Sequence, residues 1–489
     1  MPKESSGPGC HINMLGLLLP FQRLFIPGLI LLLLWAIYRT ILKKDRPVGL
    51  VLFIALIIIV DSFYNTGIYI PGMERGSIKY SEVICFFLLL HGGETKSAGG
   101  RNHLIIFLTV SYFLLFFYAA LRGYTLENGI NNYRRLIVPQ ILAVWVAYKG
   151  FDEKEDYKRF LFYFFFLVII VGLFTFWDAF FDRWILKSEV LYNPIYWSSR
   201  KQGRFGSIFL NPNYLGSFFV LMFFPLFILT IKQKMIWKKI FCWGGLLLFI
   251  FAFIKTESRG PMLGFAGSIL FFLAIPTRQF PIRRKVGALI ACVLILSLFL
   301  PGFFKAATGR FSSVEENMDE DRVSRSVIWE FTIKNLIADY PLFGIGFGEL
   351  QYIMTMRKYG FLNEYKYTLH NPHNSYLEIA VMAGCVTLLI FLRVCWVVIK
   401  SNIVYIRRHQ DDDLSLFLLA MTSGIAGFLI CLMVDMQMFT ISVAPVFWVI
   451  LFISRSLTFL KPSPVFVRQP DEEERPLYEN RHLDISHFR

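Results

Sequence analysis

The sequence predicts an all-α integral membrane protein, and two observations lead to that prediction. Hydrophobic residues make up 55% of the 489 positions and charged residues only 17%, which gives a mean hydropathy of +0.53. Long apolar runs also recur along the whole chain, and a soluble globular domain has neither feature. We therefore expect one bundle of membrane-spanning helices.

The apolar runs define the expected spans, because a helix needs about 20 residues to cross the hydrocarbon core of a bilayer. Runs that approach this length are Leu24–Leu42, Val48–Val60, His103–Leu121, Phe160–Phe181, Tyr214–Ile231, Ile240–Ile254, Met262–Ile275, Val286–Leu300, Tyr376–Ile399, Leu414–Val434 and Ile441–Leu460. Two shorter or more polar candidates, Ile78–His91 and Arg135–Lys149, bring the expected total to about 12 or 13 spans. The first run is too long for a cleaved signal peptide, so we expect it to remain as a helix.

The orientation of the bundle follows from the basic loops, because short Lys- and Arg-rich loops stay in the cytoplasm. Lys232–Lys239 and Thr277–Lys285 are both strongly basic and should be cytoplasmic. Counting spans from them places Asp182–Gly206, the turn at Ser258–Arg259 and the segment Gly302–His373 on the outer face. The net charge of +15 is therefore mainly a topology signal. A nucleic-acid-binding protein would need a soluble basic face with interleaved aromatic residues, and none is visible.

The chain accordingly divides into four parts. Residues 1–301 are expected to form membrane helices with short loops, and residues 302–374 an external loop that carries amphipathic helices. Residues 375–460 form the last membrane helices, and residues 461–489 a cytoplasmic tail. Within the external loop, apolar residues recur at helical intervals from Val323 to Ile337, and Pro341 should end that helix.

The polar sequence HNPHNSYLEIAVMAG, His370–Gly384, carries the clearest chemical signal. It places two imidazoles and an amide directly before a long apolar run, and therefore at a membrane surface. The glycines of Pro341–Leu350 lack the strand and helix that a nucleotide-binding loop requires, so we interpret them as a structural turn. The acidic cluster Met318–Arg322 is interpreted as a solvated charge run and not as a metal site. The seven cysteines lack metal-ligand spacing and are expected to be core residues.

Four segments together resemble the O-antigen ligase and O-antigen polymerase superfamily: Gln202–Phe218, Thr256–Phe265, Ser324–Leu350 and His370–Leu392. They occur in the family's order and cover the C-terminal two-thirds of the chain. The resemblance implies a GT-C-type helical bundle with one large external loop between late helices. It also implies a metal-independent glycosyltransferase without a cofactor, which uses glycans linked to polyprenyl (undecaprenyl) diphosphate.

The resemblance also assigns roles to individual residues. Arg204 and Arg259 match the family's functional arginines, and Arg325 matches the arginine of its RxxxW pattern. Guanidinium groups suit the charge that develops on a departing diphosphate, although an arginine at a span end can also be a snorkelling anchor. His373 matches the family's key histidine and is expected to act as general base, with a helix-capping role as the alternative. His370 is a second candidate for that role, and Asn374 is expected to shape the start of the helix.

The resulting hypothesis is an enzyme of the bacterial inner membrane whose active site faces the periplasm. It transfers a lipid-linked glycan to an acceptor hydroxyl, with lipid A core as the favoured acceptor, as in lipopolysaccharide biosynthesis. Polysaccharide polymerisation and protein O-glycosylation share the same signatures and remain alternatives. A flippase for the same lipid-linked glycan is the alternative from another class. That class would favour charges at mid-membrane depth and internal repeats, which the sequence does not display.

Overall fold

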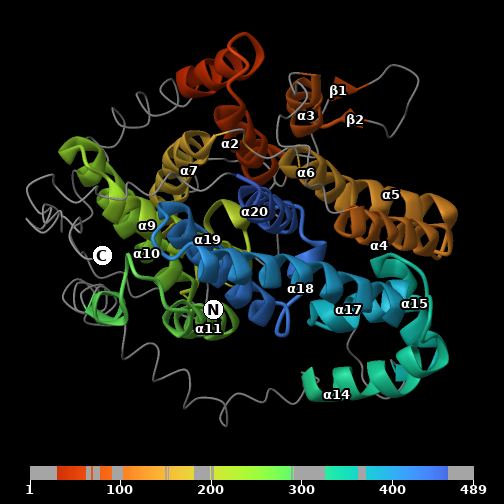
Figure 1. Cartoon of the computed structure of the whole chain (residues 1–489). Coiled ribbons are helices and arrows are strands. Elements are labelled where there is room, and N and C mark those ends of the chain that lie inside the picture. The colour runs from red at the N-terminus through yellow and green to blue at the C-terminus, as the bar shows by residue number, and fades with distance from the viewer. Residues whose placement is uncertain are drawn as a thin grey trace, which may run out of the picture.

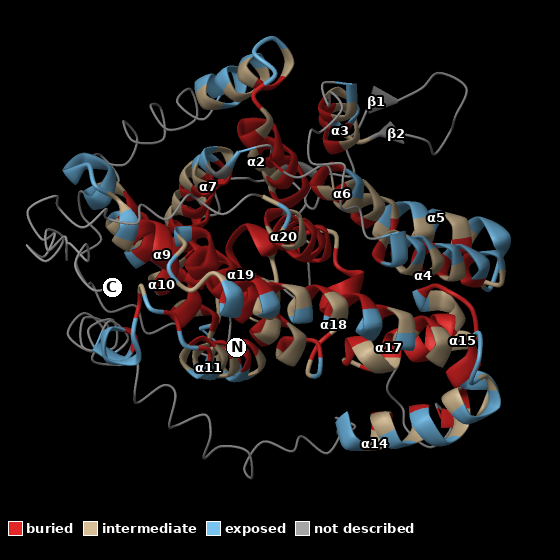
Figure 2. Ribbon diagram, viewed as in Figure 1, coloured by how far each residue is buried: buried red, intermediate tan, exposed pale blue. Residues whose placement is uncertain are grey.

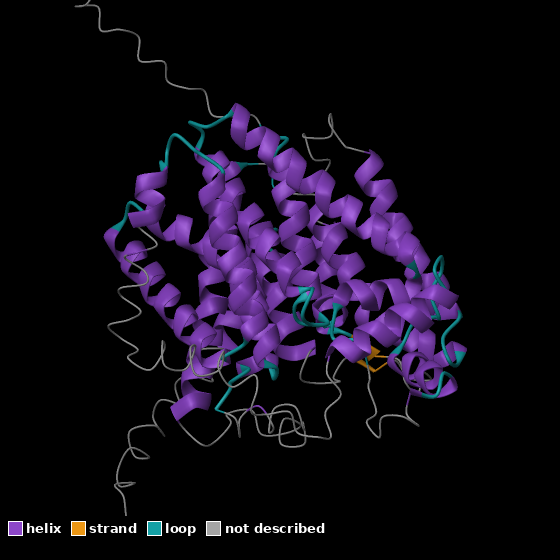
Figure 3. Cartoon of the chain, turned by 90° about the horizontal axis from the view of Figure 1, so that it is seen from below, coloured by secondary structure: helices purple, strands orange, loops and turns teal. Residues whose placement is uncertain are grey.

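The computed structural model describes residues 30–61, 68–69, 77–90, 103–148, 151, 153–180, 199, 203–287, 290, 325–361 and 371–460. These residues form a helical bundle (Figure 1). A small antiparallel pair, β1 (Ile68–Tyr69) and β2 (Ser77–Ile78), is the exception, and it lies at the edge of the bundle (Figure 3). The predicted all-α membrane architecture is confirmed.

Six helices of the described chain are long and apolar enough to cross a membrane. They are α4 (His103–Leu121), α7 (Lys154–Phe180), α9 (Pro212–Lys232), α10 (Ile236–Thr256), α18 (Cys385–Arg408) and α19 (Asp413–Cys431). Shorter apolar helices are Ile30–Ile41, α2 (Arg46–Leu56), α3 (Tyr80–Leu90), α11 (Arg259–Ala274) and α20 (Ala444–Leu457). The remaining helices are η1 (Ile57–Asp61), α5 (Leu126–Leu136), α6 (Val138–Tyr148), η4 (Ser207–Phe209), α14 (Arg325–Phe331), η5 (Thr332–Ile337), α15 (Glu349–Lys358), α17 (Ser375–Ala383) and η6 (Gln437–Phe439).

Helices α9 and α19 are the most deeply buried of the six described spans, and Figure 2 shows their buried residues in red. In an apolar 18-residue stretch of α9, 89% of the residues are buried inside the protein, and in the corresponding stretch of α19 the share is 83%. Helix α11 packs closely on α19, because Gly264 and Gly427 let the two backbones approach each other. Phe219 of α9 stacks on Phe253 of α10 with ring centroids 4.1 Å apart.

The basic loops lie together at one end of the bundle, where ion pairs connect them to the start of α19 and the loop before it. The Nζ atom of Lys232 lies 2.8 Å from a carboxylate oxygen of Asp413, and Arg278 lies 3.2 Å from Asp411. The loop after α9, the loop after α11 and the loop before α19 therefore lie at the same end. The basic character of the first two loops predicted that they would share one side. Helices α9 and α11 both begin at the other end, where the polar motifs of the sequence come together.

The apolar run Tyr376–Ile399 was expected to be one span, but the structure divides it at Gly384 into α17 and α18. Gly384 has a φ of +91°, and a Cβ atom there would lie 1.9 Å from the Leu342 carbonyl oxygen. The Cys385 N–H donates to the Pro341 carbonyl at 2.8 Å. The break therefore makes room for the turn that follows η5.

That turn is the predicted structural feature of Pro341–Leu350. Gly344, Gly346 and Gly348 all have positive φ, which costs glycine little. The N–H groups that follow bind helix ends: Ile345 donates to Val381 at 2.7 Å and Phe347 to Ala119 at 2.9 Å. The helix before the turn, α14 continued by η5, ends at Asp339 as the sequence predicted. This turn is thus fastened to α17 and α4.

Gln140 of α6 is a buried amide that links three parts of the bundle. Its Nε2 atom donates to the carbonyls of Leu136 at 2.7 Å and of Met438 at 2.8 Å. Its Oε1 atom accepts from the indole N–H of Trp448 at 2.7 Å. Helix α6 is therefore bonded to both η6 and α20.

Candidate active site

Three of the four motif segments meet at Asp435, an acidic residue in the loop between α19 and η6. They are Gln202–Phe218, Thr256–Phe265 and His370–Leu392. Its carboxylate is buried, with 5% of the residue exposed. Oδ2 accepts a hydrogen bond from the Asn213 amide at 2.6 Å, and Oδ1 accepts one from the Met436 N–H at 2.8 Å. Nδ1 of His373 lies 3.8 Å from Oδ1. This separation is within the range of an ion pair but is too long for a direct hydrogen bond.

Asn213 extends this arrangement to the two upstream motifs. It stands in the first turn of α9, where Asn211 caps the helix by accepting from the Asn213 N–H at 2.9 Å. Oδ1 of Asn213 accepts from the Ser258 hydroxyl at 2.6 Å and from the Arg204 guanidinium at 2.9 Å. Hydrogen bonds therefore run from Asp435 through Asn213 to both Ser258 and Arg204.

The charge of Asp435 is maintained despite its burial. Burial alone would raise the pKa of the carboxyl, since it removes water from the charged form. The His373 imidazole, the Met436 N–H and the Asn213 amide outweigh that effect, and the pKa of Asp435 lies below its ordinary value. A fixed negative charge therefore faces a histidine whose side chain is 41% exposed.

The backbone around His373 is held in an unusual conformation. His373 has a φ of +50°, and its N–H donates to Oδ1 of Asn371 at 2.9 Å. Asn374 caps α17 by accepting from the N–H groups of Tyr376 at 3.0 Å and Leu377 at 3.1 Å. Asn374 thus has the helix-starting role predicted for it, while His373 is left facing Asp435. His370 lies outside the described residues.

Left-handed backbone is concentrated in these motifs. The described residues other than glycine that have positive φ are Lys44, Ser207, Leu210, Glu257 and His373. All but Lys44 belong to the segments Gln202–Phe218, Thr256–Phe265 and His370–Gly384. Such conformations cost free energy and cluster where function requires a fixed geometry.

The three predicted arginines surround the same loop. Arg204 is half-buried, and its Nε also donates to the Thr256 carbonyl at 3.2 Å. Arg325 is exposed and donates to the Val434 carbonyl at 2.6 Å. Arg259 is the exposed first residue of α11, and the next residue, Gly260, packs against the side chain of Val434. The structure therefore brings Arg204, Arg259 and Arg325 to one loop, with the N-terminus of α11 beside them.

Trp329 explains the spacing of the RxxxW pattern. It lies one helical turn after Arg325, and its indole N–H donates to the Pro372 carbonyl at 2.8 Å. Arg325 and Trp329 therefore fasten α14 to the two residues that precede Asp435 and His373 in the sequence. A positioning role for Arg325 is consistent with this geometry.

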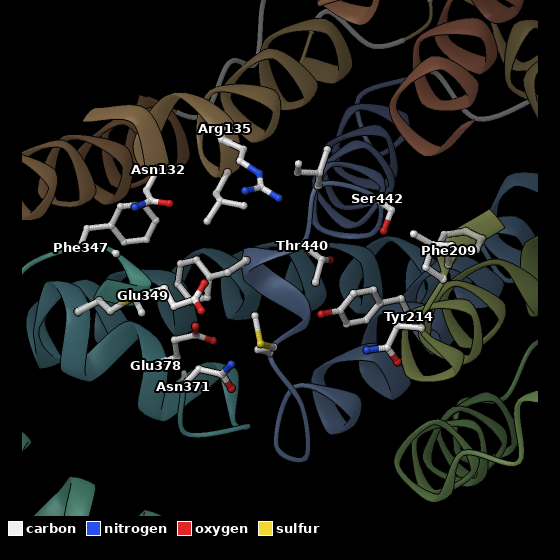
Figure 4. Close-up of a pocket in the computed structure, with 18 residues that line it drawn as sticks. Asn132, Arg135, Phe209, Tyr214, Phe347, Glu349, Asn371, Glu378, Thr440 and Ser442 are labelled. Carbon is white, nitrogen blue, oxygen red and sulfur yellow. The ribbon is translucent and has the colours of Figure 1, made fainter. Parts of the chain in front are cut away.

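A pocket of about 280 Å³ opens beside this centre (Figure 4). Asn132 and Arg135 of α5, Glu349 of α15 and Glu378 of α17 contribute polar groups to it. Glu378 is 2% exposed, and within the described chain its Oε2 atom has no hydrogen-bond partner. Burial, together with the charges of Asp435 and Glu349, raises the pKa of Glu378 well above its ordinary value.

Metal ligands are sparse around these residues. Within the described part of the chain, no group of three or more His, Cys, Asp or Glu side chains could hold a metal ion. The acidic segment Met318–Arg322 lies outside the described residues. Positive charge at the site comes from the arginines and the N-terminus of α11.

Sequence reasoning did not identify Asn213, Asp435 or Glu378. Asp435 follows an apolar run directly, and it is the single acidic residue between Asp413 and Asp471. An isolated acid at the end of a membrane span is a functional signal in its own right, and it would have identified this residue. Glu378 is similarly the single acidic residue between Glu364 and Asp411.

A family model described as O-antigen ligase matches residues 244–392. This segment contains Arg259, Arg325 and His373, and it ends before Asp435. No curated protein matches the chain. The match supports the resemblance that the sequence motifs indicated.

Proposed function

We propose that this chain transfers a glycan from polyprenyl diphosphate to an acceptor hydroxyl, and the match of residues 244–392 to the O-antigen ligase family model supports this proposal. The observation that carries the proposal is the meeting of three motif segments at the buried Asp435 carboxylate. A histidine with an adjacent carboxylate and nearby arginines supplies the parts that such a displacement requires.

In the proposed mechanism, His373 removes the proton of the acceptor hydroxyl while the hydroxyl oxygen attacks the anomeric carbon of the donor sugar. The bond between that carbon and the phosphate oxygen breaks, and polyprenyl diphosphate leaves with the bonding electrons. The proton moves to the imidazole, whose positive charge Asp435 stabilises. A carboxylate beside a catalytic histidine has this role in other enzymes.

The diphosphate is proposed to bind at Arg204, Arg259 and the N-terminus of α11. Helix N-termini and guanidinium groups are both favourable sites for phosphate oxygens. Arg259 is the strongest candidate for direct contact, because it is exposed and the described residues offer it no hydrogen-bond partner. Arg204 both supports Asn213 and adds positive charge.

We place this chemistry on the periplasmic face of the inner membrane, with lipid A core as the favoured acceptor. The site lies at the opposite end of α9 and α11 from the basic loops that contain Lys232 and Arg278. Basic loops remain in the cytoplasm, which supports an outward-facing site.

The test is transfer from a purified polyprenyl-diphosphate glycan, in detergent and with EDTA. Lipid A core and a second donor molecule are compared as acceptors. Product on lipid A core indicates a ligase, and an elongated lipid-linked glycan indicates a polymerase. Activity in EDTA is expected if the arginines replace a metal ion.

His373→Ala and Arg259→Ala should abolish transfer while the protein remains folded. The matched controls are His103→Ala and Arg283→Ala, which remove exposed side chains distant from the site and should leave transfer unchanged. Near-normal transfer by His373→Ala or Arg259→Ala would overturn that residue's role. If folded wild-type protein gives no product with either acceptor, protein acceptors and then flipping of the lipid-linked glycan become the better hypotheses.

A further inference from the structure

The pocket beside Asp435 is separate from the proposed diphosphate site. Its lining includes none of Arg204, Arg259 and Arg325. Asn371 lines it and also accepts the His373 N–H, and Met436 lines it and donates to Asp435. One end of the pocket therefore adjoins the reacting groups.

The charges of the pocket disfavour a phosphate. Glu349 and Glu378 lie side by side with their carboxyl groups in the cavity (Figure 4), and their charges interact. Among the described residues of the lining, Arg135 is the single basic one, and its guanidinium points into the same space. Because its raised pKa favours the neutral form of Glu378, the charges that remain are those of Glu349 and Arg135, which balance each other. The pocket therefore offers an anion no net positive charge, and it favours a neutral group with hydroxyls.

The buried carboxyl of Glu378 indicates that the pocket is built for a polar ligand. Leaving a buried polar atom without a partner costs free energy, and such atoms in native proteins call for an explanation. Glu378 faces a cavity that contains further hydrogen-bonding groups from Asn132, Asn371 and Tyr214. A ligand with several hydroxyl groups would satisfy them together.

Aromatic rings complete the lining. Phe209, Tyr214, Phe347 and Phe439 border the pocket among its polar groups. A sugar ring has apolar C–H faces and a rim of hydroxyl groups, which match this combination of surfaces. The volume of about 280 Å³ lies just below the roughly 300–1,000 Å³ typical of small-molecule pockets, so it suits one ring and not a long chain.

We propose that this pocket binds one sugar ring of a glycan substrate, with Glu378, Glu349 and Arg135 hydrogen-bonded to its hydroxyl groups. The assignment rests on the proposed function for the identity of that substrate. The ring belongs either to the donor glycan or to the acceptor, and both present the same chemistry to the pocket.

The test is saturation-transfer NMR on the full chain in lipid nanodiscs, since maltoside detergents carry sugar headgroups of their own. The probes are D-glucose, D-galactose, N-acetyl-D-glucosamine and D-glucosamine, each added alone. At least one should receive saturation from the wild-type protein. Arg135→Ala and Glu378→Leu should reduce that signal at least about fivefold, as expected for the loss of a hydrogen bond.

Arg134→Ala is the matched control, because Arg134 is exposed on the same helix and does not line the pocket. It should bind like the wild type. Arg135 is also exposed, so its removal should not unfold the protein even if Glu378→Leu does. Absence of binding to all four sugars, or wild-type binding by Arg135→Ala, would overturn the pocket assignment.

Transfer assays distinguish this proposal from the catalytic one and identify the source of the ring. Arg135→Ala should raise KM about tenfold for one substrate only, the acceptor or the donor, with little change in kcat. Normal KM values for both substrates would count against the assignment. His373→Ala should retain sugar binding while losing transfer, and sugar binding in a protein without any transferase activity would contradict only the proposed function.

Discussion

Nδ1 of His373 lies 3.8 Å from Oδ1 of Asp435, although α17, α18 and α19 separate the two residues in sequence. The carboxylate is held by Asn213 and by the Met436 N–H, so its position does not depend on the histidine. A preorganised negative charge stabilises an imidazole as it gains a proton, and it does so without rearrangement during the reaction.

Replacement of that charge should slow catalysis more than it weakens folding. Asp435→Asn retains the size of the side chain and part of its hydrogen bonding, and it removes the charge that faces His373. We expect kcat to fall by about 100-fold, at the low end of general-base effects. Steady-state transfer kinetics and thermal unfolding in the same detergent measure the two effects.

The control for this substitution is Asp411→Asn, which removes an exposed carboxylate at the basic end of the bundle. It should leave kcat unchanged. A kcat for Asp435→Asn close to that of the wild type would show that the carboxylate has no part in the reaction.

The pH dependence of the transfer rate should reveal the interaction between His373 and Asp435. Asp435 stays ionised at neutral and mildly acidic pH, because its pKa lies below the ordinary value. The acidic limb of the pH–rate profile should therefore come from the group that takes the acceptor's proton and not from Asp435. Asp435→Asn removes the adjacent negative charge and should move this limb to lower pH by about one unit. An unmoved limb would mean that another group controls it.

The contribution of Asp435 to folding stability should change in a more acidic pH range than the rate of transfer does. A carboxyl with a depressed folded pKa contributes stability above its unfolded pKa and loses that contribution as pH falls through the folded value. For Asp435 the loss should begin only below about pH 4. Thermal unfolding should therefore show the wild type losing stability relative to Asp435→Asn as the pH falls from about 4 to about 2.

The break between α17 and α18 should require glycine. Gly384→Ala places a methyl group 1.9 Å from the Leu342 carbonyl oxygen and forces alanine into a left-handed φ. We expect a loss of at least about 2 kcal/mol in the free energy of unfolding. Gly244→Ala in α10 is the control, since a Cβ atom there meets no other atom within 4 Å. Equal stability of the two variants would contradict the predicted strain.

Gln140→Leu should destabilise the bundle. It leaves the Trp448 indole N–H and the Met438 carbonyl without this partner in a buried setting. The expected cost is about 1–3 kcal/mol in the free energy of unfolding. Trp448→Phe and the double variant complete a cycle, and strictly additive losses would show that the two side chains are not coupled.

The sequence correctly predicted the features that depend on residues close together in the chain. Apolar runs predicted the helices, and Asn374 and Pro341 were correctly expected to mark a helix start and a helix end. The glycines after Pro341 were correctly interpreted as a turn, because no strand preceded them. The division of the Tyr376–Ile399 run was missed, since one glycine in an apolar run is compatible with a continuous helix.

The site was predictable only in part, because its central groups come from distant segments. Motifs indicated Arg204, Arg259, Arg325 and His373, and the structure places all of them around one loop. Asp435 has no neighbouring motif, and its function as the meeting point depends on the packing of α11 and α19. The assigned role of each residue stays a prediction until the variants are measured.

The amide of Gln140 has a consequence for how this protein can evolve. It bonds helix α6 to Met438, three residues after Asp435, and α6 lies far outside the segment that the family model matches. Recombination between relatives at a boundary of that segment would pair one protein's histidine with another protein's scaffold. Such hybrids should insert into membranes yet misalign their reacting groups.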